Sequence, residues 1–163
     1  MKELAVYPNS IALVDDDVFE WASRLKWHLC KINGGHLGYP HRNLTIGRKR
    51  QREEYLHRRI MNVSAGVQVD HINRDTLDNR RKNLRIASRL QSNANRGSHQ
   101  GGTSNFKGVS WYKRSQRWAA QIQVDGKKIH LGRFGNECVA AIAYNKAALK
   151  YHCKFAVLNE VAV

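Results

Sequence analysis

One short segment divides this sequence and limits the size of the hydrophobic cores that the chain can form. In residues 96–105, RGSHQGGTSN, small and polar residues replace the apolar periodicity found on either side. This composition is typical of a linker. A chain of 163 residues can form one ordinary domain or two small ones, and the segment favours two. We expect a first domain over residues 1–96, a linker over 97–104 and a second domain over 105–163.

The charge of the chain predicts a polyanionic partner. Lysine and arginine outnumber aspartate and glutamate by 28 to 13, and the formal net charge is +15. Both halves are basic, with 18 basic and 10 acidic residues up to residue 97, and 10 and 3 after it. Nucleic acid fits this distribution best. No apolar run approaches the ~20 residues of a membrane span, so we expect no membrane partner.

Cysteine usage and the amino terminus predict a cytoplasmic protein. Cys30, Cys138 and Cys153 are odd in number and far apart, so no Cys-x-x-Cys zinc motif or disulfide framework can be written. A reducing compartment fits this pattern. The segment MKELAVYPNS at the start lacks the basic end and apolar centre of a signal peptide.

The second expected domain has the pattern of a small sheet backed by one helix. Apolar residues occupy every second position over residues 118–124, which indicates a half-buried strand. Asp125 and Gly126 form a hairpin turn signal. Residues 136–151 then switch to helical spacing, and Asn136 suits the N-cap. We expect three antiparallel strands and one helix.

The first expected domain is less regular, except near its end. Residues 52–62 suggest a short helix with apolar side chains on one face. Residues 67–70 and 83–87 suggest two strands, and Ser88 with Gln91 forms the capping box of a helix. The local order is therefore strand, loop, strand and helix.

The segment DHINRDTLDNRRKNLR, residues 70–85, contains the groups that phosphodiester hydrolysis requires. That reaction needs a base for water, a cation for the charge on phosphate, and fixed geometry. Asp70 is a hard oxygen ligand for Mg²⁺, and His71 can act as a base near neutral pH. Asn83 could accept a hydrogen bond from His71 and so fix its tautomer. Asn93, in the following helix, could supply a second oxygen ligand.

Each of these residues also has a plainer structural explanation. An isolated Asp-His pair is most often a solvated turn, and Asp78 with Asn79 is more typical of a turn than of a metal site. His57 fits a packed position in a core better than a catalytic one. A basic cluster can be a solvated face, but on a chain this basic we favour phosphate contact for its members. They are Arg80, Arg81, Lys82 and Arg85.

The sequence VDHINRDTLDNRRKNLRIASRLQSNANR resembles the HNH homing endonucleases, and the similarity covers about residues 55–96. The resemblance implies a ββα-metal fold that displays a histidine, an asparagine and a final histidine or asparagine. It implies that Asp70 and Asn93 are the metal ligands, that His71 is the general base and that Asn83 orients it.

One departure concerns the end of this motif, which occupies about residues 67–96. Many relatives have the last asparagine at the position of Ser92, so either Ser92 or Asn93 faces the metal. We favour Asn93, because serine is a poor magnesium ligand. The resemblance also implies Mg²⁺ or another divalent cation such as Mn²⁺. It further implies a phage or mobile element as the source, which would place the protein in a bacterial host cytoplasm.

Residues 105–159 resemble the plant ethylene-response-factor DNA-binding domain, also called the APETALA-two domain, in the motifs KGV, RWAAQI and LGRF and in an alanine-rich helix ending in LN. In that family the sheet enters the major groove of DNA. Several residues of the plant pattern are replaced here, so the plant sequence preference does not transfer, and a merely solvated sheet face is the alternative. The implied DNA contacts are Lys107, Ser110, Tyr112, Arg114, Arg117, Gln121, Gln123, His130 and Arg133.

These observations predict an α+β protein in which a ββα-metal nuclease domain precedes a three-stranded antiparallel sheet packed on one helix. We expect a metal-dependent endonuclease that acts on double-stranded DNA, cuts one strand or both, and is a monomer or a homodimer. The rival prediction is a non-catalytic DNA-binding regulator with a degenerate HNH scaffold. RNA is a third candidate partner, but no aromatic-rich RNA motif supports it.

Overall fold

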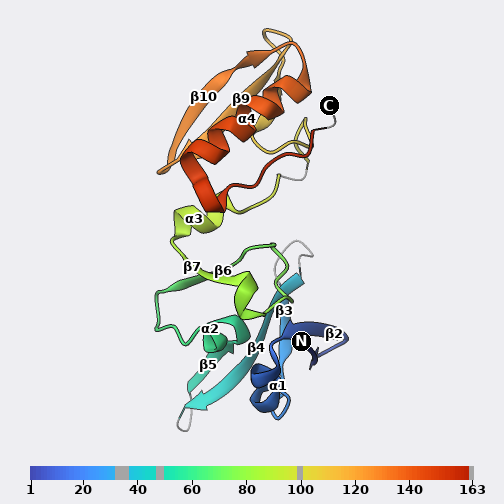
Figure 1. Cartoon of the computed structure of the whole chain (residues 1–163), viewed down its shortest axis with the longest axis vertical. Helices are drawn as coiled ribbons and strands as arrows, with labels where there is room; N and C mark the ends of the chain where they lie inside the picture. Colours follow the sequence, from blue (N-terminus) through green and yellow to red (C-terminus); the bar gives the residue numbers. More distant parts are fainter. Residues whose placement is uncertain (32–36, 47–49, 99–100, 162–163) are drawn as a thin grey trace. The chain divides into compact units, whose positions relative to one another are not determined.

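The computed structural model describes four stretches of the chain, residues 1–31, 37–46, 50–98 and 101–161 (Figure 1). The chain divides into a first unit, Met1–Ala87, and a second unit, Ser88–Val163. Helices and antiparallel sheets are mixed in both, which confirms the predicted α+β class. Residues 99 and 100 of the expected linker lie outside the described residues. Within these four stretches, no helix is both long enough and apolar enough to cross a membrane.

The first unit contains three small antiparallel sheets, β1-β2, β3-β4-β5 and β6-β7, with two short helices. Its elements are β1 (Lys2–Val6), β2 (Ser10–Val14), α1 (Asp16–Ala22), β3 (His28–Lys31), β4 (Leu37–Ile46), β5 (Arg50–Tyr55), α2 (Leu56–Ile60), β6 (Gln68–His71), the 3-10 turn η1 (Arg81–Asn83) and β7 (Leu84–Ala87).

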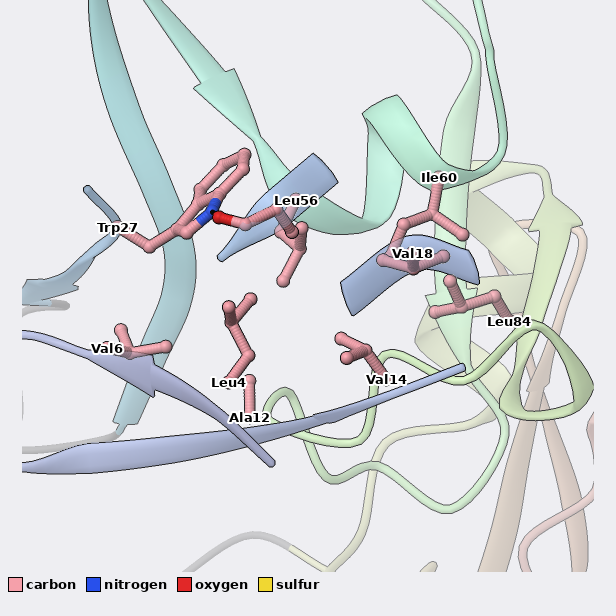
Figure 2. Packing of buried hydrophobic residues seen from close by; sticks show 10 residues of the cluster. Leu4, Val6, Ala12, Val14, Val18, Trp27, Leu56, Ile60 and Leu84 are labelled. Carbon is pink, nitrogen blue, oxygen red and sulfur yellow. Dashed lines mark hydrogen bonds between the residues drawn. The ribbon is translucent and has the colours of Figure 1, made fainter. Parts of the chain in front are cut away.

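The core of the first unit combines side chains from β1, β2, α1, α2 and β7 (Figure 2). Each buried aliphatic side chain contributes about 1.5–3 kcal/mol to stability. Leu84, the first residue of β7, belongs to this core and is 6% exposed. The β6-β7 hairpin is therefore fixed to the rest of the unit. The members of the core are Leu4, Val6, Ala12, Val14, Val18, Ala22, Trp27, Leu56, Ile60 and Leu84.

The helix predicted over residues 52–62 is wrong in its first part. β5 extends to Tyr55 and pairs with β4 along its length. Arg42 of β4 donates a hydrogen bond to Glu54 of β5 at 2.5 Å. Cross-strand pairs of opposite charge stabilise a sheet, and here strand pairing overrides the helical spacing. The helix itself is limited to α2, whose Leu56, His57 and Ile60 are buried.

The second unit has the predicted sheet and helix. Its elements are α3 (Arg89–Ala94), β8 (Val109–Tyr112), β9 (Arg117–Val124), β10 (Lys127–Phe134), α4 (Glu137–His152) and the 3-10 turn η2 (Cys153–Phe155). The strands lie in the order β10-β9-β8, all antiparallel, and α4 packs against the sheet (Figure 1). Asn136 caps α4, because its side chain accepts hydrogen bonds from the backbone of residues 138 and 139. The predicted capping box at Ser88 and Gln91 is also present.

The alternation predicted for β9 separates two faces of this sheet. Ala120 and Ile122 are buried, whereas Gln121 and Gln123, which alternate with them, are exposed. The buried face meets small side chains on α4, which allow the helix to lie close to the sheet. The buried residues of the two small cores are Val109, Ala120, Ile122, Ala140, Ala141, Tyr144, Ala147 and Ala148.

Asn159 ties the end of the described chain to the start of the sheet. Its Oδ1 accepts a hydrogen bond from the Lys107 backbone N at 2.7 Å, and its Nδ2 donates to the Lys107 carbonyl at 3.1 Å. Its own backbone N and O are paired with the side chain of Asn145 on α4, at 2.7 and 2.9 Å. One side chain thus holds the segment after α4 against the segment before β8.

The substitution Asn159→Ala is expected to lower the free energy of unfolding of the second unit by about 1–3 kcal/mol, because it removes two side-chain hydrogen bonds of about 0.5–1.5 kcal/mol each. Chemical denaturation followed through the NMR signals of β9 measures this loss. Asn105→Ala is the matched control, because Asn105 is exposed in the same unit. Surface changes of this kind stay within about 0.5 kcal/mol, so an equal loss in both variants would contradict the assignment.

Candidate active site

The β6-β7 hairpin carries Asp70 and His71 on opposite faces. Asp70 pairs with Arg85, and His71 pairs with Leu84. Successive residues of a strand point to opposite sides, and directly opposed residues share a side. His71 and Leu84 therefore face the core, at 4% and 6% exposure, whereas Asp70 and Arg85 share the other face.

Asp70 forms a close ion pair with Arg85. Nε and Nη2 of Arg85 both lie 2.8 Å from Oδ2 of Asp70, and the two side chains are only 11% and 13% exposed. The carboxylate of Asp70 is therefore already paired with a cation, the guanidinium of Arg85. A divalent ion bound to Asp70 would compete with the guanidinium of Arg85.

Asp70 itself supplies a carboxylate, which is a hard oxygen ligand for a divalent cation. Over the stretches that the structure describes, no three His, Cys, Asp or Glu side chains gather as a metal-binding group. A site at Asp70 would therefore use one carboxylate with amide or hydroxyl oxygens and water. Magnesium suits such a site, because it prefers oxygen ligands and usually keeps several waters.

His71 faces an asparagine from the loop that joins β6 to β7. Its Nε2 lies 3.4 Å from Oδ1 of Asn79, and both side chains are buried. Burial lowers the pKa of His71 below 6.5, while the contact with Asn79 acts in the opposite direction. The ring is therefore neutral at neutral pH. A proton on Nε2 would be shared with Asn79, and this tautomer carries its lone pair on Nδ1.

Asn83 fixes the loop that contains Asn79. Its Oδ1 accepts a hydrogen bond from the Asn73 backbone at 3.0 Å, and its Nδ2 donates to Asn73 Oδ1 at 2.9 Å and to the Asp78 carbonyl at 2.7 Å. Direct orientation of His71 by Asn83 stays a prediction. The sequence reasoning missed Asn79 as a neighbour of His71, because a single sequence offers no signal that separates it from the other asparagines of the loop.

The same loop is anchored on the first strands of the unit. The backbone N of Leu13 donates to the Leu77 carbonyl at 2.8 Å, and the backbone N of Asn79 donates to the Leu13 carbonyl at 2.8 Å. Asp78 is 2% exposed and pairs with Arg80 at 2.5 Å, and the hydrogen bonds from Arg80 lower the pKa of Asp78. The loop is therefore held by hydrogen bonds to β2 as well as by the side chain of Asn83.

Three of the four basic residues predicted to contact DNA near this site are held in ion pairs. Arg80 pairs with Asp78, and Arg85 pairs with Asp70. Arg81 pairs with Asp17 at 2.7 Å, and Lys82 is exposed. Contact of these four residues with DNA stays a prediction.

Asn93 lies in the second unit, on α3. Together with Leu90, Gln91 and Ala94 of α3, it lines a pocket of about 580 Å³ whose other walls come from β9 and the end of α4. Each residue of an α-helix turns the side-chain direction by ~100°, so Ser92 lies on the opposite side of α3 from this pocket. The side chains of the two candidates for the second metal ligand are therefore about 100° apart around the helix axis. A metal contact by Asn93 stays a prediction.

The predicted DNA contacts of the second unit mostly share the exposed face of its sheet. The strand register places Ser110 opposite Ala119, Tyr112 opposite Arg117, and Gln121 opposite His130. The guanidinium of Arg133 lies 4.1 Å from the centre of the Tyr112 ring. The predicted contacts on this face are Ser110, Tyr112, Arg117, Gln121, Gln123, His130 and Arg133.

Three further cationic side chains lie on or near this sheet. Arg114 is exposed in the turn between β8 and β9. Lys107 lies before β8, and its Nζ donates to the Ala94 carbonyl. Lys128 is paired with Gln123 and is exposed, so it belongs to the same face. The sequence reasoning omitted Lys128, although the two-residue period counted back from His130 could have found it.

His57 lies against His71 inside the first unit. The ring centres are 5.3 Å apart at an interplanar angle of 68°, and the Tyr39 ring lies 4.9 Å from His57 and 5.8 Å from His71. Nδ1 of His57 is buried, and no described residue bonds to it. Burial lowers the pKa of His57 to about 3, and the nearby His71 and Arg58 act in the same direction.

The low pKa of His57 predicts a loss of stability in mild acid. The histidine of the unfolded chain takes up a proton near pH 6.5 and the folded one only near 3, so stability is complete above 6.5 and falls as the pH drops through this window. Between about pH 7.5 and about pH 5 the loss from His57 is about 2 kcal/mol. Chemical denaturation at both pH values measures it, and His57→Phe should remove this part of the loss. An unchanged pH dependence in that variant would contradict the assignment.

Comparisons with known proteins confirm both resemblances predicted from the motifs. Residues 54–94 match the family model described as HNH endonuclease. The chain is 28% identical to an uncharacterized HNH endonuclease of Acanthamoeba polyphaga mimivirus over 155 residues, which are 94% of this chain and 76% of that protein. It is 39% identical to APETALA2-like protein 2 of Oryza sativa subsp. indica over 57 residues, or 35% of this chain, and spans only 13% of that protein.

Proposed function

We propose that this chain, which joins an HNH endonuclease segment to an APETALA2-like segment, is a metal-dependent endonuclease that hydrolyses a phosphodiester bond of double-stranded DNA. The family match indicates a nuclease. The observation that carries the proposal is the β6-β7 hairpin, where Asp70 and His71 are adjacent and Asn79 faces His71. Within the chain, we place the nuclease domain at residues 1–96, the linker at 97–104 and the DNA-binding domain at 105–163.

His71 is the proposed general base. Its low pKa keeps the imidazole neutral at neutral pH, and only a neutral ring can accept a proton from water. If the proton of the neutral ring is on Nε2, toward Asn79, the ring would accept the proton from water at Nδ1. Asn83 acts through the loop that carries Asn79.

Asp70 and Asn93 are the proposed ligands of Mg²⁺ or of another divalent cation such as Mn²⁺. Both supply hard oxygen donors, and two protein ligands leave room for water and for phosphate oxygens. When bound, the ion stabilises the charge that develops on the phosphate and on the leaving oxygen. Arg85, released from Asp70, is then available to contact a phosphate of the duplex.

The exposed sheet face of the second unit is the proposed DNA reader. It offers amide, hydroxyl, imidazole and guanidinium groups on neighbouring strands, and such groups recognise base edges and phosphates. A reader tethered to the cleavage site raises the local concentration of that site on the same duplex. Arg133, Arg117 and Lys128 supply positive charge on this face.

Incubation of the purified chain with supercoiled plasmid tests the proposal. We expect cleavage with Mg²⁺ or Mn²⁺ and none with EDTA, and the ratio of open-circular to linear product distinguishes cleavage of one strand from cleavage of both. Gel-shift binding to duplex DNA is measured in parallel, with structured RNA as competitor. Binding without cleavage under any divalent ion would refute the nuclease and support a non-catalytic regulator, and preferred binding of RNA would refute the DNA assignment.

A further inference from the structure

His57 is a buried histidine that the proposed reaction does not use. It is only 6% exposed and lies on α2 between Leu56 and Ile60, which belong to the core of the first unit. Its ring meets the ring of His71 edge to face, at 5.3 Å between centres. The catalytic hairpin thus touches this core directly through the side chain of the proposed base.

Two rings, those of Tyr39 and His57, lie against the His71 imidazole. Tyr39 of β4 lies against His57 at 4.9 Å and against His71 at 5.8 Å between ring centres. On the side of Nε2, Asn79 lies 3.4 Å away. The ring of His71 is therefore limited on several sides by groups from β4, α2 and the loop.

The contact from His57 depends on ring shape and not on a hydrogen bond. Nδ1 of His57 is buried, and among the described residues it has no hydrogen-bond partner. The ring is uncharged at neutral pH, because burial lowers the pKa of His57 to about 3. An uncharged aromatic ring of the same size would make the same edge-to-face contact.

We propose that His57 is a positioning residue that sets the orientation of the His71 imidazole by direct ring contact. The inference rests on the proposed role of His71 as general base. A base must be held in line with the proton that it accepts, and a misplacement of about 1 Å can lower a rate by about 10²-fold. Loss of the His57 ring allows the imidazole to turn away from Asn79.

Cleavage kinetics separate this positioning role from a purely structural one. His57→Ala should lower kcat by about 10- to 10²-fold with KM and duplex affinity unchanged, and His57→Phe should restore kcat to within about threefold of the wild type. Ile60→Ala is the matched control, because it truncates another buried residue of α2. It should retain the wild-type kcat while it lowers stability. Wild-type kcat in folded His57→Ala, or a defect in His57→Phe as large as in His57→Ala, would overturn the proposal.

A second measurement does not depend on cleavage. Three-bond NMR couplings of His71 in the DNA-free chain report its side-chain rotamer. We expect one rotamer in the wild type and in His57→Phe, and averaged couplings in His57→Ala. Unchanged couplings in His57→Ala would overturn the positioning role even if the wild type cuts DNA. If the wild type cuts no DNA but the couplings change as expected, the nuclease assignment fails and the ring contact stands.

Discussion

Alanine in place of His71 is expected to lower the rate of metal-dependent plasmid cleavage by about 10²- to 10⁴-fold, the usual contribution of a positioned general base. The expectation follows from the contact of His71 with Asn79 and from its low pKa, which together keep a neutral imidazole in one orientation. Single-turnover cleavage of supercoiled plasmid, with enzyme in excess, measures the effect without interference from product release.

Two controls protect this prediction from a folding artefact. His71 is buried, so the NMR spectrum of the variant must show that the first unit is folded. Ile86→Ala changes a side chain that is 59% exposed on β7 of the same hairpin, and it should cleave at the wild-type rate. Gel-shift affinity should be unchanged in both variants. Cleavage by a folded His71→Ala variant within tenfold of the wild type would remove His71 from the role of base.

The second large effect is expected from Asp70→Asn. Asparagine keeps the shape of the side chain and can still accept a hydrogen bond from Arg85, but it lacks the negative charge that holds a divalent ion. Metal binding supplies several kcal/mol of charge stabilisation, which corresponds to a loss of about 10³-fold in rate. Cleavage measured over a series of Mg²⁺ and Mn²⁺ concentrations should show this loss, with partial recovery at the highest concentrations.

A charge-matched control is available in the loop next to this site. Asp75 is exposed, and its Oδ1 accepts a hydrogen bond from the Leu77 backbone, which asparagine at that position can also accept. Asp75→Asn therefore removes one negative charge near the site and should leave the metal requirement unchanged. An equal loss in the two variants would show that net charge, and not a ligand at Asp70, determines the rate.

The same titration identifies the ligand from α3. If Asn93 supplies it, Asn93→Ala raises the metal concentration needed for half-maximal cleavage and Ser92→Ala does not. The reverse result would assign the ligand to Ser92, which lies on the opposite side of α3 from the pocket lined by Asn93.

Local sequence signals predicted those elements whose stability depends on nearby residues. The alternation in β9, the turn at Asp125 and Gly126, the N-cap at Asn136 and the capping box at Ser88 all agree with the structure. Each of these signals acts over a few residues. The α+β class followed from them, since they predict a sheet with one apolar face and a helix next to it in the sequence that can cover this face.

Structural features that depend on residues far apart in the sequence could not be predicted from local patterns. The extension of β5 to Tyr55 depends on pairing with β4 across a hairpin, which local spacing does not report. The ion pair of Arg81 with Asp17 and the position of Asn79 beside His71 depend on where the loop meets β2 and α1. Spacing within residues 70–85 predicted roles for Asp70 and His71, but it could not predict the ring contacts and the Asn79 contact of His71.

The β6-β7 loop is anchored on Leu13, and Leu84 packs in the core with Val14 and Val18. These contacts limit which part of the chain can be moved into another protein by recombination or by design. The stretch that matches the HNH family model starts only at residue 54. Four residues that contact its loop, Leu84 or the His71 ring come before that point, namely Leu13, Val14, Val18 and Tyr39. Transplanting the matched stretch alone would remove the hydrogen bonds of the β6-β7 loop to Leu13 and the packing of Leu84 against Val14 and Val18.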